Sequence, residues 1–144
     1  MLQILSDQQK RDLLEQVQTI AVVGLSPKPE SPSHRVAKFL QNNSYKIVPV
    51  RPAISTLLGE QAYKVLNDIP FTIDLVDVFR APQFVPEIVE QCINCGIRAI
   101  WLQEGVIHNE AAERAQNAGV SVIMDKCIYK EFIRLEIDRV KVIN

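Results

Sequence analysis

Basic side chains recur just behind apolar segments of the chain. One or two positions after an apolar run stand Arg51, Arg80 and Lys126. Another run is followed by a loop that contains Lys28, and Arg35 comes shortly after that loop. These basic residues outnumber the acidic residues at the same places, although the whole chain, with Lys+Arg 16 and Asp+Glu 17, is slightly acidic. Such a local excess of positive charge favours a polyanionic ligand.

The segment 24–33, GLSPKPESPS, lies between an apolar run and a predicted helix. Free backbone N–H groups and the helix dipole attract phosphate at such a place. Three prolines stiffen the segment, and Ser26, Ser31 and Ser33 supply hydroxyl groups. The dinucleotide fingerprint G-x-G-x-x-G is absent, because only Gly24 matches its glycines. We therefore predict a preformed phosphate-binding loop, with a rigid structural turn as the alternative.

Arg51 stands at the end of the second apolar run, 27 residues after Gly24. NAD-binding sites place an acidic residue there to hold the ribose hydroxyls. An arginine instead favours a ribose phosphate, which both NADP and coenzyme A carry. The residue type leaves these two ligands open, together with an ordinary solvated surface arginine.

Apolar runs and helical patterns alternate along the chain. The runs at 19–24, 46–50, 74–79, 99–103 and 120–124 are typical of buried parallel strands. The spacing also predicts five helices. The first begins at the capping-box pair Ser6 and Gln9, and the second is capped by Ser33. The third runs from Pro86 to Gly96, the fourth is capped by Asn109 and ends at Gly119, and the fifth lies beyond Ile128. The segment 136–144 is ambiguous between a strand and a tail.

This alternation predicts the α/β class: a Rossmann-like, doubly wound, mostly parallel sheet with helices on both faces. Ligands of such sheets bind at the carboxyl ends of the strands. The residues that directly follow the predicted strands are therefore the candidates for a site.

Length and composition narrow the function classes. The 144 residues, 47% of them apolar, fit a single domain over 1–144, with a core at about 19–135. A formal charge of −1 argues against nucleic acid as a partner. No apolar stretch approaches the roughly 20 residues needed to cross a bilayer, and the start lacks the pattern of an export signal. Together with three cysteines, an odd number, this predicts a cytoplasmic protein with reduced thiols.

The residues that usually carry chemistry give no catalytic constellation or metal site. Cys92 and Cys95 form a C-x-x-C at the end of a predicted helix, where a packing role is favoured. His34 and His108 lack neighbours that would indicate a nucleophile–base pair. We expect Asp77, within a predicted strand, to satisfy buried backbone donors.

Five segments, in order, resemble the small standalone CoA-binding proteins, which are similar to the nucleotide-binding domain of the succinyl-CoA synthetase α subunit. The segments are AVVGLSPKP at 21–29, SPSHRVA at 31–37, VDVFRAP at 76–82, WLQEGV at 101–106 and MDKC at 124–127. The resemblance implies a Rossmann-like domain that binds coenzyme A. Gly24, Ser26, Pro27, Lys28 and Arg35 would surround the phosphates, and Phe79 and Arg80 would lie near the nucleotide. This sequence departs from the family pattern at His34, where Tyr is common, and at Arg51, where Asn is common.

The leading hypothesis is a module that binds coenzyme A or an acyl-CoA as a carrier, sensor or regulator and not as an enzyme. The predicted binding residues are Gly24, Ser26, Pro27, Lys28, Ser33, His34, Arg35, Arg51, Phe79, Arg80, Gln103 and Gly105. A further hypothesis is a mixed disulfide between Cys127 and the CoA thiol, against a small buried thiol as the alternative. Two alternative functions stay open: an NADP-binding oxidoreductase domain, and an interaction protein whose nucleotide site has decayed. Apolar residues near the C-terminus are compatible with a homo-oligomer.

Overall fold

A parallel sheet of five strands forms the centre of the molecule, for which a computed structural model describes residues 2–139. The strands of this sheet are β1 (Thr19–Val23), β2 (Lys46–Val50), β5 (Leu75–Val78), β6 (Ala99–Leu102) and β7 (Ser121–Ile123). Their order across the sheet is β2-β1-β5-β6-β7, and every pair of neighbours is parallel. The predicted α/β, Rossmann-like sheet is therefore confirmed.

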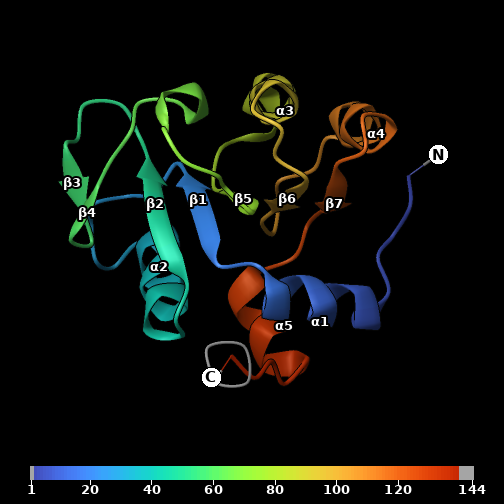
Figure 1. The fold of residues 1–144 in the computed structure, drawn as a ribbon, viewed down its shortest axis with the longest axis horizontal. Coiled ribbons are helices and arrows are strands. Elements are labelled where there is room, and N and C mark those ends of the chain that lie inside the picture. Colours follow the sequence, from blue (N-terminus) through green and yellow to red (C-terminus); the bar gives the residue numbers. More distant parts are fainter. Residues whose placement is uncertain (1, 140–144) are drawn as a thin grey trace.

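Helices cover both faces of the sheet (Figure 1). On one face lie α3 (Val85–Asn94) and α4 (Asn109–Asn117). The other face carries α1 (Asp7–Gln16), α2 (Pro32–Asn42) and α5 (Ile128–Arg134). Because side chains alternate along a strand, each face has its own apolar cluster: Val76 and Val78 of β5 belong to one, and Leu75 belongs to the other.

Three helix starts can be compared with the sequence predictions. Ser6 caps α1 through the predicted capping box with Gln9. The prediction for α2 is wrong, because Ser31 is its N-cap and Ser33 lies inside the first turn. The prediction for α4 is wrong as well: His108 is the N-cap, and its ring accepts a hydrogen bond from the Ala111 amide. In both cases a polar residue one or two positions after the true cap has a suitable side chain, so the residue type alone does not fix the position of the cap.

A small hairpin lies beyond β2, at one edge of the molecule (Figure 1). Its strands are β3 (Thr56–Leu57) and β4 (Glu60–Gln61). The two turn residues, Leu58 and Gly59, both have positive φ. No sequence pattern predicted this hairpin, because leucine rarely occupies such a turn position. Two short 3₁₀ turns, η1 (Leu66–Asp68) and η2 (Pro82–Phe84), complete the connections on either side of β5.

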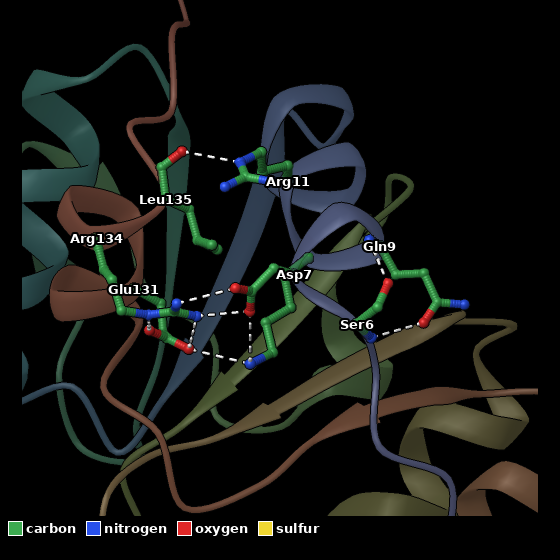
Figure 2. Close-up of polar contacts among 8 residues, drawn as sticks. Ser6, Asp7, Gln9, Arg11, Glu131, Arg134 and Leu135 are labelled. Carbon is green, nitrogen blue, oxygen red and sulfur yellow. Dashed lines mark hydrogen bonds and ion pairs between the residues drawn. The ribbon is translucent and has the colours of Figure 1, made fainter.

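Helix α1 is fastened to α5 by a network of charged side chains (Figure 2). Lys10 and Glu131, both more than nine-tenths buried, form an ion pair of 3.1 Å. Arg134 donates two hydrogen bonds to Asp7 and two to Glu131. The hydrogen bond from Arg134, followed by the contact with Lys10, lowers the pKa of Glu131 against the opposing effect of burial. The network thus keeps a buried carboxylate ionised and joins residues more than 120 positions apart.

The C-terminal segment ends the described chain without a strand. Glu136, with a φ of 54°, turns the backbone behind α5, and Arg139 reaches back to the carbonyl oxygens of Glu15 and Ser44. The sequence left 136–144 ambiguous, and 140–144 lie outside the described residues. None of the helices between residues 2 and 139 has the length and apolar character that a membrane span requires.

Candidate functional site

The strand order reverses between β1 and β5, which makes the carboxyl ends of these two strands the topological switch point of the sheet. The chain leaves β1 toward β2 on one side, whereas β5 lies on the other side of β1. Ligands of open α/β sheets bind at this switch point. Gly24 follows β1 and Phe79 follows β5, so the two predicted segments meet here.

Gly24 is pressed against the segment behind β5. Its φ of +86° is unfavourable for side-chain-bearing residues. A Cβ atom at this position would lie 2.6 Å from the Phe79 carbonyl oxygen and 3.0 Å from Cδ of Arg80. Glycine is therefore required both by the backbone conformation and by the close approach of the two loops.

The loop behind β1 is held by its own hydrogen bonds. The Ser26 amide donates to the Ser33 hydroxyl oxygen at 2.9 Å, and the Lys28 amide donates to the Ser26 hydroxyl oxygen at 3.1 Å. The His34 ring donates from Nδ1 to the Ser26 carbonyl oxygen at 2.9 Å. The Ser31 hydroxyl donates to the Lys28 carbonyl oxygen. These hydrogen bonds make the loop rigid, as both the predicted cradle and the alternative of a structural turn require, and the His34 ring braces it.

Helix α2 directs its N-terminus toward this loop. Its first residue is Pro32, and the side chain of its N-cap Ser31 makes no capping hydrogen bond. The amides of Ser33 and His34 belong to the first turn, where N–H groups have no acceptor within the helix. Arg35 and Lys28 are exposed beside them. The turn thus offers backbone donors, the positive end of a helix dipole and two cations to an anion.

Arg51 supports the loop from the second strand. Its Nη1 atom donates to the Leu25 carbonyl oxygen at 3.4 Å, and the side chain is half-buried. The sequence predicted that Arg51 would lie at the carboxyl edge of the sheet, and the structure places it there. The contact with Leu25 was beyond sequence reasoning, because it joins residues 26 positions apart.

Arg80 lies just beyond β5, against the loop that follows β1. Its guanidinium group sits 4.0 Å from the centre of the Phe84 ring, a distance typical of a cation–π contact. Both Phe79 and Arg80 are half-buried. Phe84 was not among the predicted site residues, and its position on a short 3₁₀ turn gave no signal of this stacking. The contact restrains Arg80 and leaves its charge available to a ligand.

Gln103 and Gly105 extend the site along the ends of β6 and β7. The buried Gln103 side chain accepts a hydrogen bond from the Ile128 amide through Oε1, and the backbone amide of Gln103 donates to the Val78 carbonyl oxygen. The Gly105 amide donates to Oδ1 of Asp125 at 2.8 Å. Gln103 therefore anchors α5 to the sheet, while Gly105 stands at the far end of the predicted site.

Asp77 departs from its sequence prediction. The side chain is fully buried on β5, and neither carboxylate oxygen has a hydrogen-bond partner among the described residues. The expectation that it satisfies buried backbone donors is therefore wrong, since neighbouring strands already pair those donors. Burial raises the pKa of Asp77 well above its ordinary value, which favours a neutral carboxylic acid.

The three cysteines occupy different environments. Cys92 is buried, and burial raises the pKa of its thiol to about 12, consistent with a packing role. Cys95 is exposed and donates to the Asn67 side chain. Cys127 is half-buried and is the N-cap residue of α5. Between residues 2 and 139, His, Cys, Asp and Glu side chains form no group of three that could hold a metal ion.

An open parallel sheet with a glycine turn, a helix N-terminus and free cations at its switch point defines the class of Rossmann-like nucleotide-binding domains. Residues 18–132 match the family model of the CoA binding domain. The chain belongs to this family.

The chain is similar to two proteins that it matches over most of their length. The chain is 38% identical to the uncharacterized protein YneT of Bacillus subtilis over 118 residues, which are 82% of this chain and 87% of that protein. A hypothetical protein from Pyrococcus horikoshii superimposes with a TM-score of 0.89 at 34% identity, covering 94% of this chain and 98% of its own.

Larger enzymes contain the same domain. The ADP-forming acetate–CoA ligase of Methanocaldococcus jannaschii is 24% identical over 118 residues, which are 76% of this chain but 17% of that protein. The chain thus spans about one sixth of that ligase. The matched segment is the part that the two proteins share.

Proposed function

We propose that this chain binds coenzyme A or an acyl-CoA at the switch point and acts as a non-catalytic carrier, sensor or regulatory module. The observation that carries the proposal is the contact of two loops at Gly24, where the loop that leads into α2 lies against Phe79 and Arg80. The phosphates would lie on the α2 turn with Lys28 and Arg35, and the nucleotide would lie near Phe79 and Arg80.

The histidines support a binding role over a catalytic one. His34 donates to the Ser26 carbonyl oxygen, and His108 accepts from the Ala111 amide. Each ring thus serves the local backbone and is not paired with a nucleophilic side chain in the described part of the chain. An oxidoreductase that uses NADP is the second function to test, because Arg51 lies at the position that a ribose phosphate would reach.

Calorimetry with coenzyme A, acetyl-CoA, NADP and NAD tests the proposal on ligand-stripped protein. We expect selective binding of coenzyme A or acetyl-CoA, and we expect Arg80→Ala to weaken it about tenfold, because a charge-assisted phosphate contact is worth roughly 1.5 kcal/mol. Arg114→Ala is the matched control: Arg114 is exposed on α4 and paired with Glu90. A preference for NADP would favour the oxidoreductase, and the absence of binding to all four ligands would favour an interaction protein.

The thiol end of the ligand gives a second test. If the pantetheine arm runs from Gly24 along the strand ends past Gly105, its thiol approaches Cys127. We expect Cys127 to attack the disulfide bond of CoA disulfide, which forms the Cys127–CoA mixed disulfide and releases one CoA thiolate. Binding should make this reaction about tenfold faster than the reaction with a small disulfide that lacks the nucleotide.

Mass spectrometry under nonreducing conditions reads out the modified cysteine. Cys127→Ser should abolish the adduct, whereas Cys95→Ser, which removes the exposed thiol of α3's C-cap, should retain it. Equal rates with both disulfides, or modification at Cys95, would contradict this course of the pantetheine arm.

A further inference from the structure

The two histidine rings of the chain carry their hydrogens on different nitrogens. His34 donates from Nδ1 to the Ser26 carbonyl oxygen at 2.9 Å, and because a carbonyl oxygen only accepts, Nδ1 must hold a hydrogen. His108 does the reverse: its Nδ1 accepts a hydrogen bond from the Ala111 amide at 3.1 Å, so this nitrogen must be bare. A second proton can therefore join His34 at Nε2 without breaking its hydrogen bond, whereas a second proton on His108 would break the N-cap of α4.

The Nε2 atom of His34 is free to bind a ligand. It has no hydrogen-bond partner among residues 2–139. In that part of the chain, the buried side-chain nitrogen and oxygen atoms without a partner belong to Asp77 and Arg139, so Nε2 is not sealed from solvent. The two nitrogens of an imidazole ring point away from each other, and Nε2 therefore faces away from the Ser26 carbonyl. The ring holds the loop with one nitrogen and offers the other to an occupant of the site.

The charges around this ring are mostly positive. The charged residues on the elements that meet at the loop are Lys28, Glu30, Arg35, Lys38, Arg51 and Arg80. Helix α5 adds Tyr129, which stacks on Phe39 one turn further along α2. Within the described residues, neither the His34 ring nor Glu30 takes part in an ion pair. A bound pyrophosphate therefore brings the main negative charge to the ring, and a nearby anion stabilises imidazolium over the neutral form.

We infer that His34, as an imidazolium, binds a phosphate of the ligand through Nε2, so that binding of coenzyme A is coupled to the uptake of a proton. The inference rests on the proposed function, because the phosphates must first lie at the first turn of α2. Two observations carry it: the hydrogen bond at Nδ1 leaves Nε2 as the nitrogen that can gain a proton, and this gain keeps the loop intact. Because histidine changes its charge between about pH 5 and 8, the affinity for coenzyme A should fall as the pH rises through this range.

Calorimetry of coenzyme A binding at about pH 6 and about pH 8 compares the unmodified protein with His34→Asn. The asparagine amide replaces Nδ1 as a donor to the Ser26 carbonyl oxygen, but it has no atom at the place of Nε2 and no charge. We expect the unmodified protein to bind about fivefold more tightly than His34→Asn at the lower pH, the upper range for an exposed charge pair, and about equally at the higher pH. The titration of the ligand's own phosphate affects both proteins alike and cancels in this ratio.

His108→Asn is the matched control. It removes the other histidine, and asparagine is a preferred N-cap residue, so α4 keeps its cap. This variant should retain the pH dependence of the unmodified protein. Calorimetry in two buffers that differ in their enthalpy of ionisation counts the protons that binding takes up. The unmodified protein and His108→Asn should both take up more protons than His34→Asn.

The outcomes separate the inference from the proposed function. A merely structural brace at His34 would give an affinity ratio that is the same at both pH values, and equal proton uptake by the unmodified protein and His34→Asn. Either result would overturn the inference and leave the proposed function in place. Loss of the pH dependence in His108→Asn would also overturn it. Failure of the unmodified protein to bind coenzyme A would overturn both.

Discussion

Gly24→Ala is expected to destabilise the protein by about 2 kcal/mol or more and to weaken coenzyme A binding by at least about tenfold. A left-handed backbone costs an alanine roughly 1 kcal/mol, and the φ of Gly24 is +86°. The added Cβ would also lie 2.6 Å from the Phe79 carbonyl oxygen, so one of the two loops must move. Because the proposed site lies between these loops, any such movement displaces the phosphate donors relative to Arg80.

Gly59→Ala provides the matched control for this substitution. Gly59 has a similar φ of +75°, but a Cβ there would meet nothing within 4 Å. Gly59→Ala should therefore lower the free energy of unfolding only by the cost of the left-handed backbone, about 1 kcal/mol, and leave the binding of coenzyme A unchanged. Urea unfolding and calorimetry measure the two effects. Equal losses of stability in both variants, with binding retained by Gly24→Ala, would contradict the role assigned to the loop contact.

Asp77→Asn is expected to remove a pH dependence that the unmodified protein carries. Burial raises the pKa of Asp77 well above its ordinary value of 3.8, so the folded state keeps a proton that the unfolded state releases. The contribution of Asp77 to stability is therefore complete below the unfolded pKa and is lost as the pH rises toward the folded pKa. Its slope reaches about 1.4 kcal/mol per pH unit.

The asparagine variant carries no charge at this position at any pH. Compared with the unmodified protein, its free energy of unfolding should become progressively more favourable as the pH rises above 3.8, the ordinary pKa of the carboxyl group. Urea unfolding at several pH values measures the difference. Asp12→Asn, at an exposed position of α1, should retain the pH dependence of the unmodified protein. Parallel curves for the unmodified protein and Asp77→Asn would show that the carboxyl group is ionised in the folded state.

The sheet was predictable because its strands are apolar on both faces and are separated by helical patterns. Each predicted strand contains an observed one, and the glycines at 96 and 119 mark helix ends where the left-handed conformation is needed. The loop at Gly24 was also predictable, since a glycine between a strand and a helix start permits the positive φ that a tight turn there requires. The sequence resemblance added the ligand class and not the geometry.

Other features depend on contacts between distant residues and gave no local signal. The partner of Gly24 is Phe79, and nothing near Gly24 in the sequence reveals how closely they approach. The N-cap of α2 was predicted at Ser33 and is found at Ser31, because both serines in this loop have a side chain suited to that position. Asp77 was assigned donors that the neighbouring strands already use. The ion pairs between α1 and α5 join two helices that no local pattern connects.

The ion pairs between α1 and α5 have a consequence for the order in which the chain acquires its structure. Lys10 is synthesised early, but its buried partner Glu131 follows 121 residues later. Throughout translation of the sheet, Lys10 has only Asp7 of its own helix as a counter-charge, and contacts between distant residues form slowly. Helix α1 should therefore leave the ribosome before the sheet and be one of the last elements to dock.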